Sequence, residues 1–540
     1  MKPNRRELLA TMLGVPAALA AGCSSSRVPD LPPGEIVGPS VDFGHRLRDG
    51  ERPMPKDDQW SKASVVIVGG GVAGLAAAWR LRRAGINDFV LLELEPDPGG
   101  TARSGSGGNG RFPWGAHYVP APMAHHRHMI DLLNDMGMIV GIEADGTPMI
   151  AESALCRDPQ ERIFYRGRWY EGLYLHAGES TDDIRQFQAF HRVIDNWVVW
   201  RDSRGRRAFT LPVADCSDDP FVASLDRETM ADWLGRYGFT SPRLKWLVNY
   251  ACRDDYGATA EHVSAWAGLF YFVARINRPG SEAQPLLTWP EGNGRFVRFL
   301  ADRAKQHMRT GWGVSDIISR GNDRQTQIDV IAASSDRQAR GYRTNRVIFA
   351  APQYMAKHAL RDYRLQTPEH VHEFEYGAWM VANLHLRDRP AEVGAEMAWD
   401  NVLIESPSLG YVVNTHQIGR DHGPTTFTYY YALCDADPKQ ARRRLLQSDW
   451  RDWADVALTD LTTAHSDIRR HVERLDIMRW GHAMIRPKPG FIWGGARRNA
   501  ARPHRGIHFA GADLSGIALF EEAFHHGVRA AEEVLEAVHV

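Results

Sequence analysis

The sequence lacks the features that mark several special classes of protein. Its charges nearly cancel, with 65 Lys and Arg against 66 Asp and Glu, whereas nucleic-acid-binding proteins carry a basic excess. No apolar run approaches the roughly 20 residues that cross a bilayer, which excludes a polytopic membrane protein. Cysteine accounts for 5 of the 540 residues, and no pair has the close spacing of a zinc site. We therefore expect a folded protein with no nucleic-acid partner and no metal.

Residues 1–22 have the layout of a secretory signal peptide. A short basic region is followed by an uncharged stretch that Pro16 interrupts, and this stretch is too short for a permanent membrane anchor. Arg5 and Arg6 resemble the pair of a twin-arginine export signal. The residues up to Cys23 resemble a bacterial lipobox, with an ordinary cleavage site as the alternative. We expect an exported protein of the bacterial periplasm or cell envelope, with membrane contact limited to a lipid on Cys23.

The stretch from residue 64 to residue 93 has the pattern of a dinucleotide-binding fold. A short β-branched run predicts a buried parallel strand, and glycines on the G-x-G-x-x-G spacing follow it. Such glycines permit a tight turn, backbone access for a pyrophosphate and close packing of the next helix, whose amino terminus attracts phosphate. A second strand ends at an acid that can bond a ribose diol. The residues expected to bind here are Gly69, Gly71, Val72, Ala73, Gly74 and Glu93.

Three later segments, 98–104, 112–118 and 506–531, resemble the flavin-containing amine oxidase superfamily, which includes monoamine and polyamine oxidases and has phytoene desaturases as relatives. The resemblance implies FAD rather than NAD, because NAD alone would not need the carboxy-terminal segment. No Cys stands shortly before that segment, so non-covalent FAD is expected. The resemblance adds these residues to the FAD site: Gly99, Gly100, Thr101, Arg103, Gly115, Ala116, His117, Val314, Ala351, Gly511, Asp513 and Ala523.

The same resemblance implies an α/β fold, in which a discontinuous FAD/NAD(P)-binding Rossmann-like domain is interleaved with an α+β substrate domain. We expect the FAD-binding domain to comprise 61–125, 286–352 and 480–540, and the substrate domain to comprise 126–285 and 353–479. Within the substrate domain, 184–200 predicts an amphipathic helix, and the runs 411–415 and 425–431 predict an antiparallel hairpin. Residues 23–60 are rich in Ser, Pro and Gly, which predicts a flexible tether.

The sequence indicates the catalytic residues less clearly than the FAD-binding residues. Amine oxidases typically carry an active-site lysine, and the resemblance places Val381 at that position. The candidates are His117, His482 and Glu522, with core packing as the alternative for the histidines and helix capping for the glutamate. Three histidines at 125, 126 and 128 fit a polar helix start better than a metal site.

We expect an FAD-dependent oxidoreductase that oxidises an amine or a related small organic substrate by hydride transfer to flavin N5. The electron acceptor would be O₂ or a redox partner. One alternative is a desaturase or isomerase that acts on a lipid-like isoprenoid substrate, and another is a binding protein that has lost its flavin. The sequence does not name the substrate.

Overall fold

The computed structural model describes residues 31–322 and 325–539. The predicted signal peptide, the arginine pair, Cys23 and the first part of the predicted tether lie outside these residues. The tether prediction is wrong for residues 31–60, which contain helix α2 (Val41–Arg48) and pack onto the protein. Composition alone was misleading here, because Phe43 and Leu47, four residues apart, give α2 a buried apolar face. Within the described part of the chain, no helix is both long enough and apolar enough to cross a membrane.

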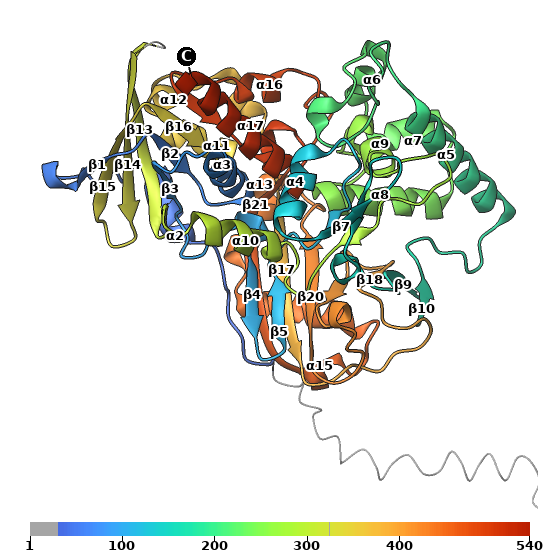
Figure 1. Cartoon of the computed structure of the whole chain (residues 1–540). Helices are drawn as coiled ribbons and strands as arrows, with labels where there is room; N and C mark the ends of the chain where they lie inside the picture. The colour runs from blue at the N-terminus through green and yellow to red at the C-terminus, as the bar shows by residue number, and fades with distance from the viewer. Residues whose placement is uncertain (1–30, 323–324, 540) are drawn as a thin grey trace, which may run out of the picture.

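A five-stranded parallel sheet forms one side of the molecule (Figure 1). Its strands, in spatial order, are β12 (Met308–Arg309), β3 (Phe89–Leu92), β2 (Val65–Val68), β16 (Arg346–Phe349) and β22 (Ile507–Phe509). Helix α3 (Val72–Arg83) follows β2 and packs against α10 (Gly294–Ala304) and the long α17 (Phe520–His539). Segments from both ends of the chain are therefore neighbours in this sheet and its helical layer.

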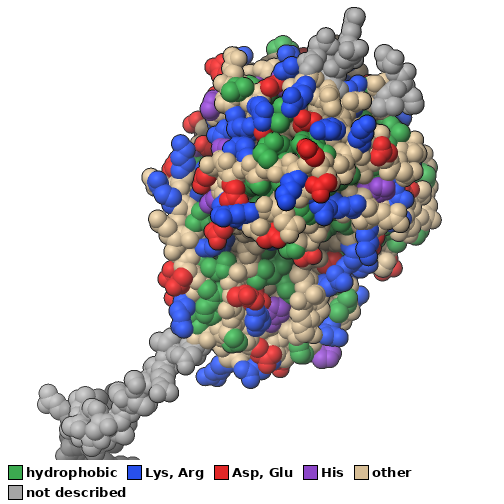
Figure 2. All heavy atoms as spheres, turned by 90° about the vertical axis from the view of Figure 1, so that its left-hand side faces the viewer, with side chains coloured by type: hydrophobic (Ala, Val, Ile, Leu, Met, Phe, Trp, Pro, Cys, Tyr) green, Lys and Arg blue, Asp and Glu red, His purple; other side chains and the backbone are tan. Residues whose placement is uncertain are grey.

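A four-stranded sheet lies beside the parallel sheet. Its strands, in spatial order, are β1 (Trp60–Lys62), β15 (Ala339–Thr344), β14 (Gln325–Ser334) and β13 (Trp312–Asn322). The register of β13 against β14 shifts after Val314, at the end nearest β3. On the face drawn in Figure 2, Lys and Arg side chains are interspersed with Asp and Glu, in keeping with the nearly cancelling charges of the sequence.

A seven-stranded mixed sheet forms the lower part of the view in Figure 1. Its strands, in spatial order, are β10 (Arg168–Glu171), β9 (Glu161–Tyr165), β18 (Asp400–Leu403), β19 (Tyr411–Val413), β20 (Thr425–Ala432), β17 (Tyr376–Leu386) and β21 (Val472–Ile485). The predicted hairpin is confirmed, since β19 pairs antiparallel with β20. Every residue of β17 and β20 is buried, because helices such as α14 (Trp450–Thr462) cover one face and the candidate site adjoins the other.

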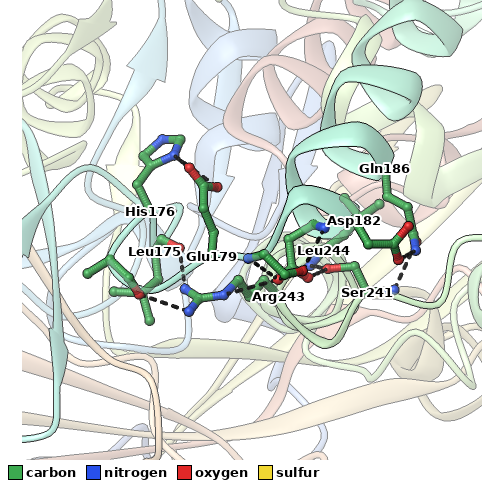
Figure 3. Close-up of polar contacts among 11 residues, drawn as sticks. Leu175, His176, Glu179, Asp182, Gln186, Ser241, Arg243 and Leu244 are labelled. Atoms are coloured by element: carbon green, nitrogen blue, oxygen red, sulfur yellow. Dashed lines mark hydrogen bonds and ion pairs between the residues drawn. The ribbon is translucent and has the colours of Figure 1, made fainter.

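Helices α5 (Thr181–Val199), α7 (Met230–Arg236), α8 (Pro242–Tyr256) and α9 (Ala265–Val273) pack together at the remaining side. Helix α5 confirms the amphipathic helix predicted over 184–200. Figure 3 shows how the start of α8 is fixed to α5: Gln186 Oε1 accepts the backbone N–H groups of Thr240 and Ser241, and Ser241 Oγ donates to Asp183 at 2.5 Å. Arg243 donates to the carbonyls of Leu175 and Ala177. These bonds hold α8, whose last turn carries two aspartates of the candidate site.

Candidate cofactor and active site

A cavity of about 910 Å³ lies where the parallel sheet, the seven-stranded sheet, α8 and α17 meet. It brings together most of the residues that the sequence assigned to the cofactor, although these are spread over more than 400 positions of the chain. The predicted cofactor residues that line it are Gly69, Gly71, Val72, Ala73, Glu93, Gly99, Gly100, Thr101, Gly115, Ala116, His117, Val314, Ala351, Gly511, Asp513 and Ala523. Gly74 and Arg103 do not line it.

The glycine loop between β2 and α3 leaves backbone exposed to this cavity. Gly69 has φ +102°, a conformation that other residues rarely adopt. Gly71 is the N-cap of α3, no side chain caps the helix there, and a Cβ at Gly71 would meet nothing within 4 Å. A Cβ at Gly74 would instead collide with the Gly69 carbonyl, so Gly74 serves helix packing, as the motif predicts for its third glycine. The uncapped N–H groups of α3 fit a pyrophosphate.

Two partly buried carboxylates follow strands β3 and β22 of the parallel sheet, which are separated in the sheet by β2 and β16. Glu93 follows β3 and accepts the backbone N–H groups of Gly70 and Glu95, and its burial raises its pKa. Asp513 follows β22 and accepts the Tyr376 hydroxyl at 2.6 Å and the Gln353 N–H at 2.8 Å. A carboxylate offers about four acceptor positions, so each can bond further hydroxyl groups.

This set of donors and acceptors fits a flavin dinucleotide. An uncapped helix terminus suits the pyrophosphate, a carboxylate at each strand end suits the ribose and ribityl hydroxyls, and apolar Val314 and Ala351 offer a surface for adenine. None of the four described cysteines lines the cavity, which agrees with non-covalent binding. The arginine expected to wrap the cofactor, Arg103, lies behind the wall, with its guanidinium 5.3 Å from the ring of Trp480 and 3.7 Å from Glu95.

The part of the cavity next to Gly115 is aromatic. His117 stacks on Tyr430 with ring centroids 4.7 Å apart, and the Tyr430 hydroxyl donates to the Gly115 carbonyl at 2.8 Å. Burial lowers the pKa of His117 to about 4, so this imidazole is neutral at physiological pH. Val381, which the resemblance placed at the position of the family's lysine, lines the cavity between these rings and β21. Lys488, which precedes the carboxy-terminal FAD segment in the sequence, pairs with Glu373 at 3.2 Å and does not line the cavity.

A group of carboxylates that sequence reasoning missed forms the wall beyond the aromatic rings. Asp254 and Asp255 of α8 line the cavity, and Asp255 accepts from Arg275 at 3.0 Å and from Tyr118 at 3.2 Å. Asp254 has no hydrogen-bond donor among the described residues. Burial, and then the Asp255 carboxylate, raise the pKa of Asp254. Glu521 of α17 also lines the cavity, and burial raises its pKa to about 7. Two adjacent aspartates near the end of an apolar helix were the available signal in the sequence.

The other catalytic candidates lie elsewhere. His482 lies on β21 at another part of the cavity lining, where its ring stacks on Tyr354 with centroids 4.1 Å apart. Glu522 does not line the cavity: its carboxylate accepts the Val213 N–H at 2.7 Å and the Ser515 hydroxyl. The prediction that Glu522 is catalytic is therefore corrected, because its carboxylate is used in bonds that tie α17 to other segments rather than capping its own helix.

The histidines at 125, 126 and 128 lie at the start of helix α4 (Arg127–Asp135). His126 Nδ1 accepts the Met123 N–H at 3.1 Å, and the His125 ring nitrogen lies 2.7 Å from the Thr210 hydroxyl. Among the residues that the structure describes, no three His, Cys, Asp or Glu side chains are arranged to hold a metal ion.

Comparison with solved structures gives the same fold at low sequence identity. Putrescine oxidase bound to putrescine matches 88% of this chain and 100% of its own, with 14% identity and a TM-score of 0.64. Cyclohexylamine oxidase from Brevibacterium oxydans matches 89% and 100%, with 15% identity and a TM-score of 0.61. A fatty acid isomerase from P. acnes matches 89% and 99%, with 14% identity and a TM-score of 0.59.

Among curated proteins, mitochondrial dimethylglycine dehydrogenase of Rattus norvegicus is 27% identical over 125 residues, which are 23% of this chain and 15% of that protein. The chain thus spans less than a fifth of the length of this relative. The model of the family described as flavin containing amine oxidoreductase matches residues 72–535, which include α3 directly after the glycine loop, the acidic wall and most of α17. The chain belongs to the flavin containing amine oxidoreductase family.

Proposed function

We propose that the protein is an FAD-dependent oxidoreductase that oxidises an amine, and the observation that carries this proposal is the acidic wall of the cavity. Asp254 and Asp255 stand next to the aromatic rings, and the guanidinium of Arg275 compensates the negative charge of Asp255. The charge of Asp254 has no such partner within hydrogen-bond distance among the described residues. Withdrawing a carboxylate such as that of Asp254 partly from water is costly unless a cation pairs with it, and a substrate ammonium supplies that cation.

The reaction requires the protein only to orient the substrate and to take one proton from it. When bound, FAD would supply the acceptor for the two electrons and the hydrogen that leave the substrate together as hydride. Asp254 takes a proton from the ammonium. Its raised pKa suits this role, because a general base is most efficient when its pKa lies near the working pH. The neutral amine then loses hydride from its α carbon, which leaves an iminium that water hydrolyses. The neutral His117 and the rings of Trp379 and Tyr430 hold the substrate without repelling it.

A second candidate is a desaturase or isomerase of a lipid-like substrate. Val381 favours it, because an apolar side chain replaces the lysine that amine oxidases typically carry. An apolar substrate would however leave the Asp254 carboxylate without a counter-charge, and for this reason we favour an amine.

Anaerobic reduction of the flavin distinguishes amine oxidation from action on a lipid-like substrate. We expect the 450-nm absorbance of the flavin to bleach when the protein is mixed with amines, because hydride transfer reduces the ring. Stopped-flow absorbance measures the bleaching with a panel of mono-, di- and N-methylated amines. A panel of isoprenoids, tested in the same way, serves as the comparison. Bleaching by an isoprenoid and by none of the amines would overturn the proposal in favour of the second candidate.

We further propose that the parallel sheet with its helices is a discontinuous FAD-binding domain, and that the seven-stranded sheet with α5–α9 is the substrate domain. The three-segment origin of the parallel sheet supports this division. The electron acceptor would be O₂ or a redox partner.

Export by the twin-arginine route is a separate proposal, supported by the sequence pattern around Arg5 and Arg6. We expect replacement of both by lysine to stop export, since the route requires the arginine pair. Fractionation of cells that express the full chain, with Lys2→Arg as the control, measures this. Unchanged export of the double variant would contradict the assignment.

A further inference from the structure

The segment before the family match has a structural role that the motifs do not account for. Residues 33–48, here called the strap, precede the matched residues 72–535, yet they run from the seven-stranded sheet to the loop after β3. Seven of them line the large cavity: Pro39, Ser40, Val41, Gly44, His45, Leu47 and Arg48.

The first anchor of the strap is the edge of β21. The Leu475 N–H donates to the Pro33 carbonyl at 3.0 Å, and the Ile477 N–H donates to the Glu35 carbonyl at 2.9 Å. The Val37 N–H donates back to Ile477 at 2.7 Å. This alternation is that of a parallel strand pair, so the strap extends the sheet.

The second anchor is the loop that carries the expected ribose-binding acid. The backbone N–H and the hydroxyl of Ser40 donate to the two carboxylate oxygens of Glu95, at 2.8 and 3.1 Å. The N–H of Glu95 in turn donates to Glu93 at 2.8 Å. The strap is thus connected through Glu95 to the carboxylate that faces the adenosine end of the cavity.

Helix α2 packs on the protein with one face and lines the cavity chiefly with another, and Leu47 belongs to both. Phe43 and Leu47 form a small core with Leu94 and Ala333, and they pack against Gly313, next to Val314. Val41, Gly44, His45 and Arg48, which line the cavity, stand at i, i+3, i+4 and i+7 and so share one face of the helix. A Cβ at Gly44 would meet nothing within 4 Å.

From this arrangement we propose that the strap is an additional segment of the FAD-binding site, and that it closes over the ADP half of the cofactor. The packing face of α2 lies on the strand and loop expected to contact adenosine, and its other face lines the same cavity. The inference rests on FAD being the cofactor and is independent of the proposed amine substrate. Its consequence is that the strap slows release of FAD from the folded protein.

Gly44→Trp tests the proposal, with Gly235→Trp as its matched control. The indole would extend from the cavity-facing side of α2, at a position where a Cβ meets no neighbouring atom within 4 Å. We expect FAD to bind about 100-fold more weakly, as measured by fluorescence titration of the apoprotein. Gly235→Trp should keep wild-type affinity, because Gly235 is exposed on α7, does not line the cavity, and its Cβ would also meet nothing within 4 Å.

Fragments of the cofactor locate the effect. Titration of the apoprotein with ADP and with riboflavin should show weaker binding of ADP in Gly44→Trp and unchanged binding of riboflavin. Unchanged FAD and ADP affinity would overturn the proposal, as would a loss confined to riboflavin. If Gly44→Trp does not fold by circular dichroism, Ser40→Ala replaces it: we expect FAD to dissociate several-fold faster from that variant, and a wild-type dissociation rate would refute the strap.

Discussion

Gly71→Leu is expected to give a folded protein that no longer retains FAD. Gly71 caps α3 without a side chain, and a Cβ there would meet nothing within 4 Å of the protein itself. The free space lies in the cavity whose lining fits the dinucleotide. A leucine side chain would therefore leave the fold of the apoprotein intact and occupy the place where a pyrophosphate approaches the helix. We expect the flavin content to fall from one per chain to nearly none, with a loss of affinity of at least 100-fold.

The flavin absorbance of the purified protein, relative to its protein concentration, measures this. Gly235→Leu is the control, because Gly235 lies in α7, is exposed and does not line the cavity, and its Cβ would also meet nothing within 4 Å. Gly74→Ala should behave differently from both, since its Cβ collides with the Gly69 carbonyl and lowers the stability of the apoprotein. Full flavin content in Gly71→Leu would refute the placement of the cofactor.

The contrast between the glycine loop and the acidic wall shows what local sequence can and cannot predict. The loop is local: β2, its glycines, α3 and the acid after β3 lie within about 30 residues, so spacing alone predicted their geometry. The wall is assembled from α8, the loop after α9 and the start of α17, and no spacing relates Asp255 to Arg275 or to Glu521. Its function depends on tertiary contacts that the sequence pattern does not encode.

The choice between Glu521 and Glu522 has a related cause. Adjacent residues of a helix point about 100° apart, and in α17 Glu521 lines the cavity whereas Glu522 does not. The orientation of α17 is set by its packing on α3, where Gly527 lies against the backbone of Ala73. The resemblance to the family located α17 in the sequence. The rotation of α17 about its own axis follows from its contact with α3. A flexible tether was predicted where the strap lies, because the prediction relied on the Ser, Pro and Gly content of this segment and not on the apolar pair in α2.

Asp254→Asn is expected to reduce the rate of flavin reduction by an amine by about 100-fold or more, while FAD stays bound. The asparagine keeps the volume of the side chain but cannot take a proton from an ammonium or pair with its charge. The neighbouring ion pair of Asp255 with Arg275 stays in place, so the wall should keep its shape. Glu522→Gln tests the alternative base, and we expect it to change the rate only a few-fold, because Glu522 does not line the cavity.

The pH dependence identifies the role of Asp254 more sharply than the rate alone. Burial raises its pKa, so in the wild type the carboxylate becomes protonated as the pH falls through that raised value, and the rate should fall with it. In Asp254→Asn this acidic limb should disappear, leaving a low rate that is nearly independent of pH on the acid side. Single-turnover stopped-flow measurements between pH 5 and pH 9, on protein whose flavin content equals that of the wild type, measure both profiles. An unchanged acidic limb in the variant would show that another group takes the proton, and Glu521, whose pKa burial raises to about 7 on the same wall, would then be the residue to replace.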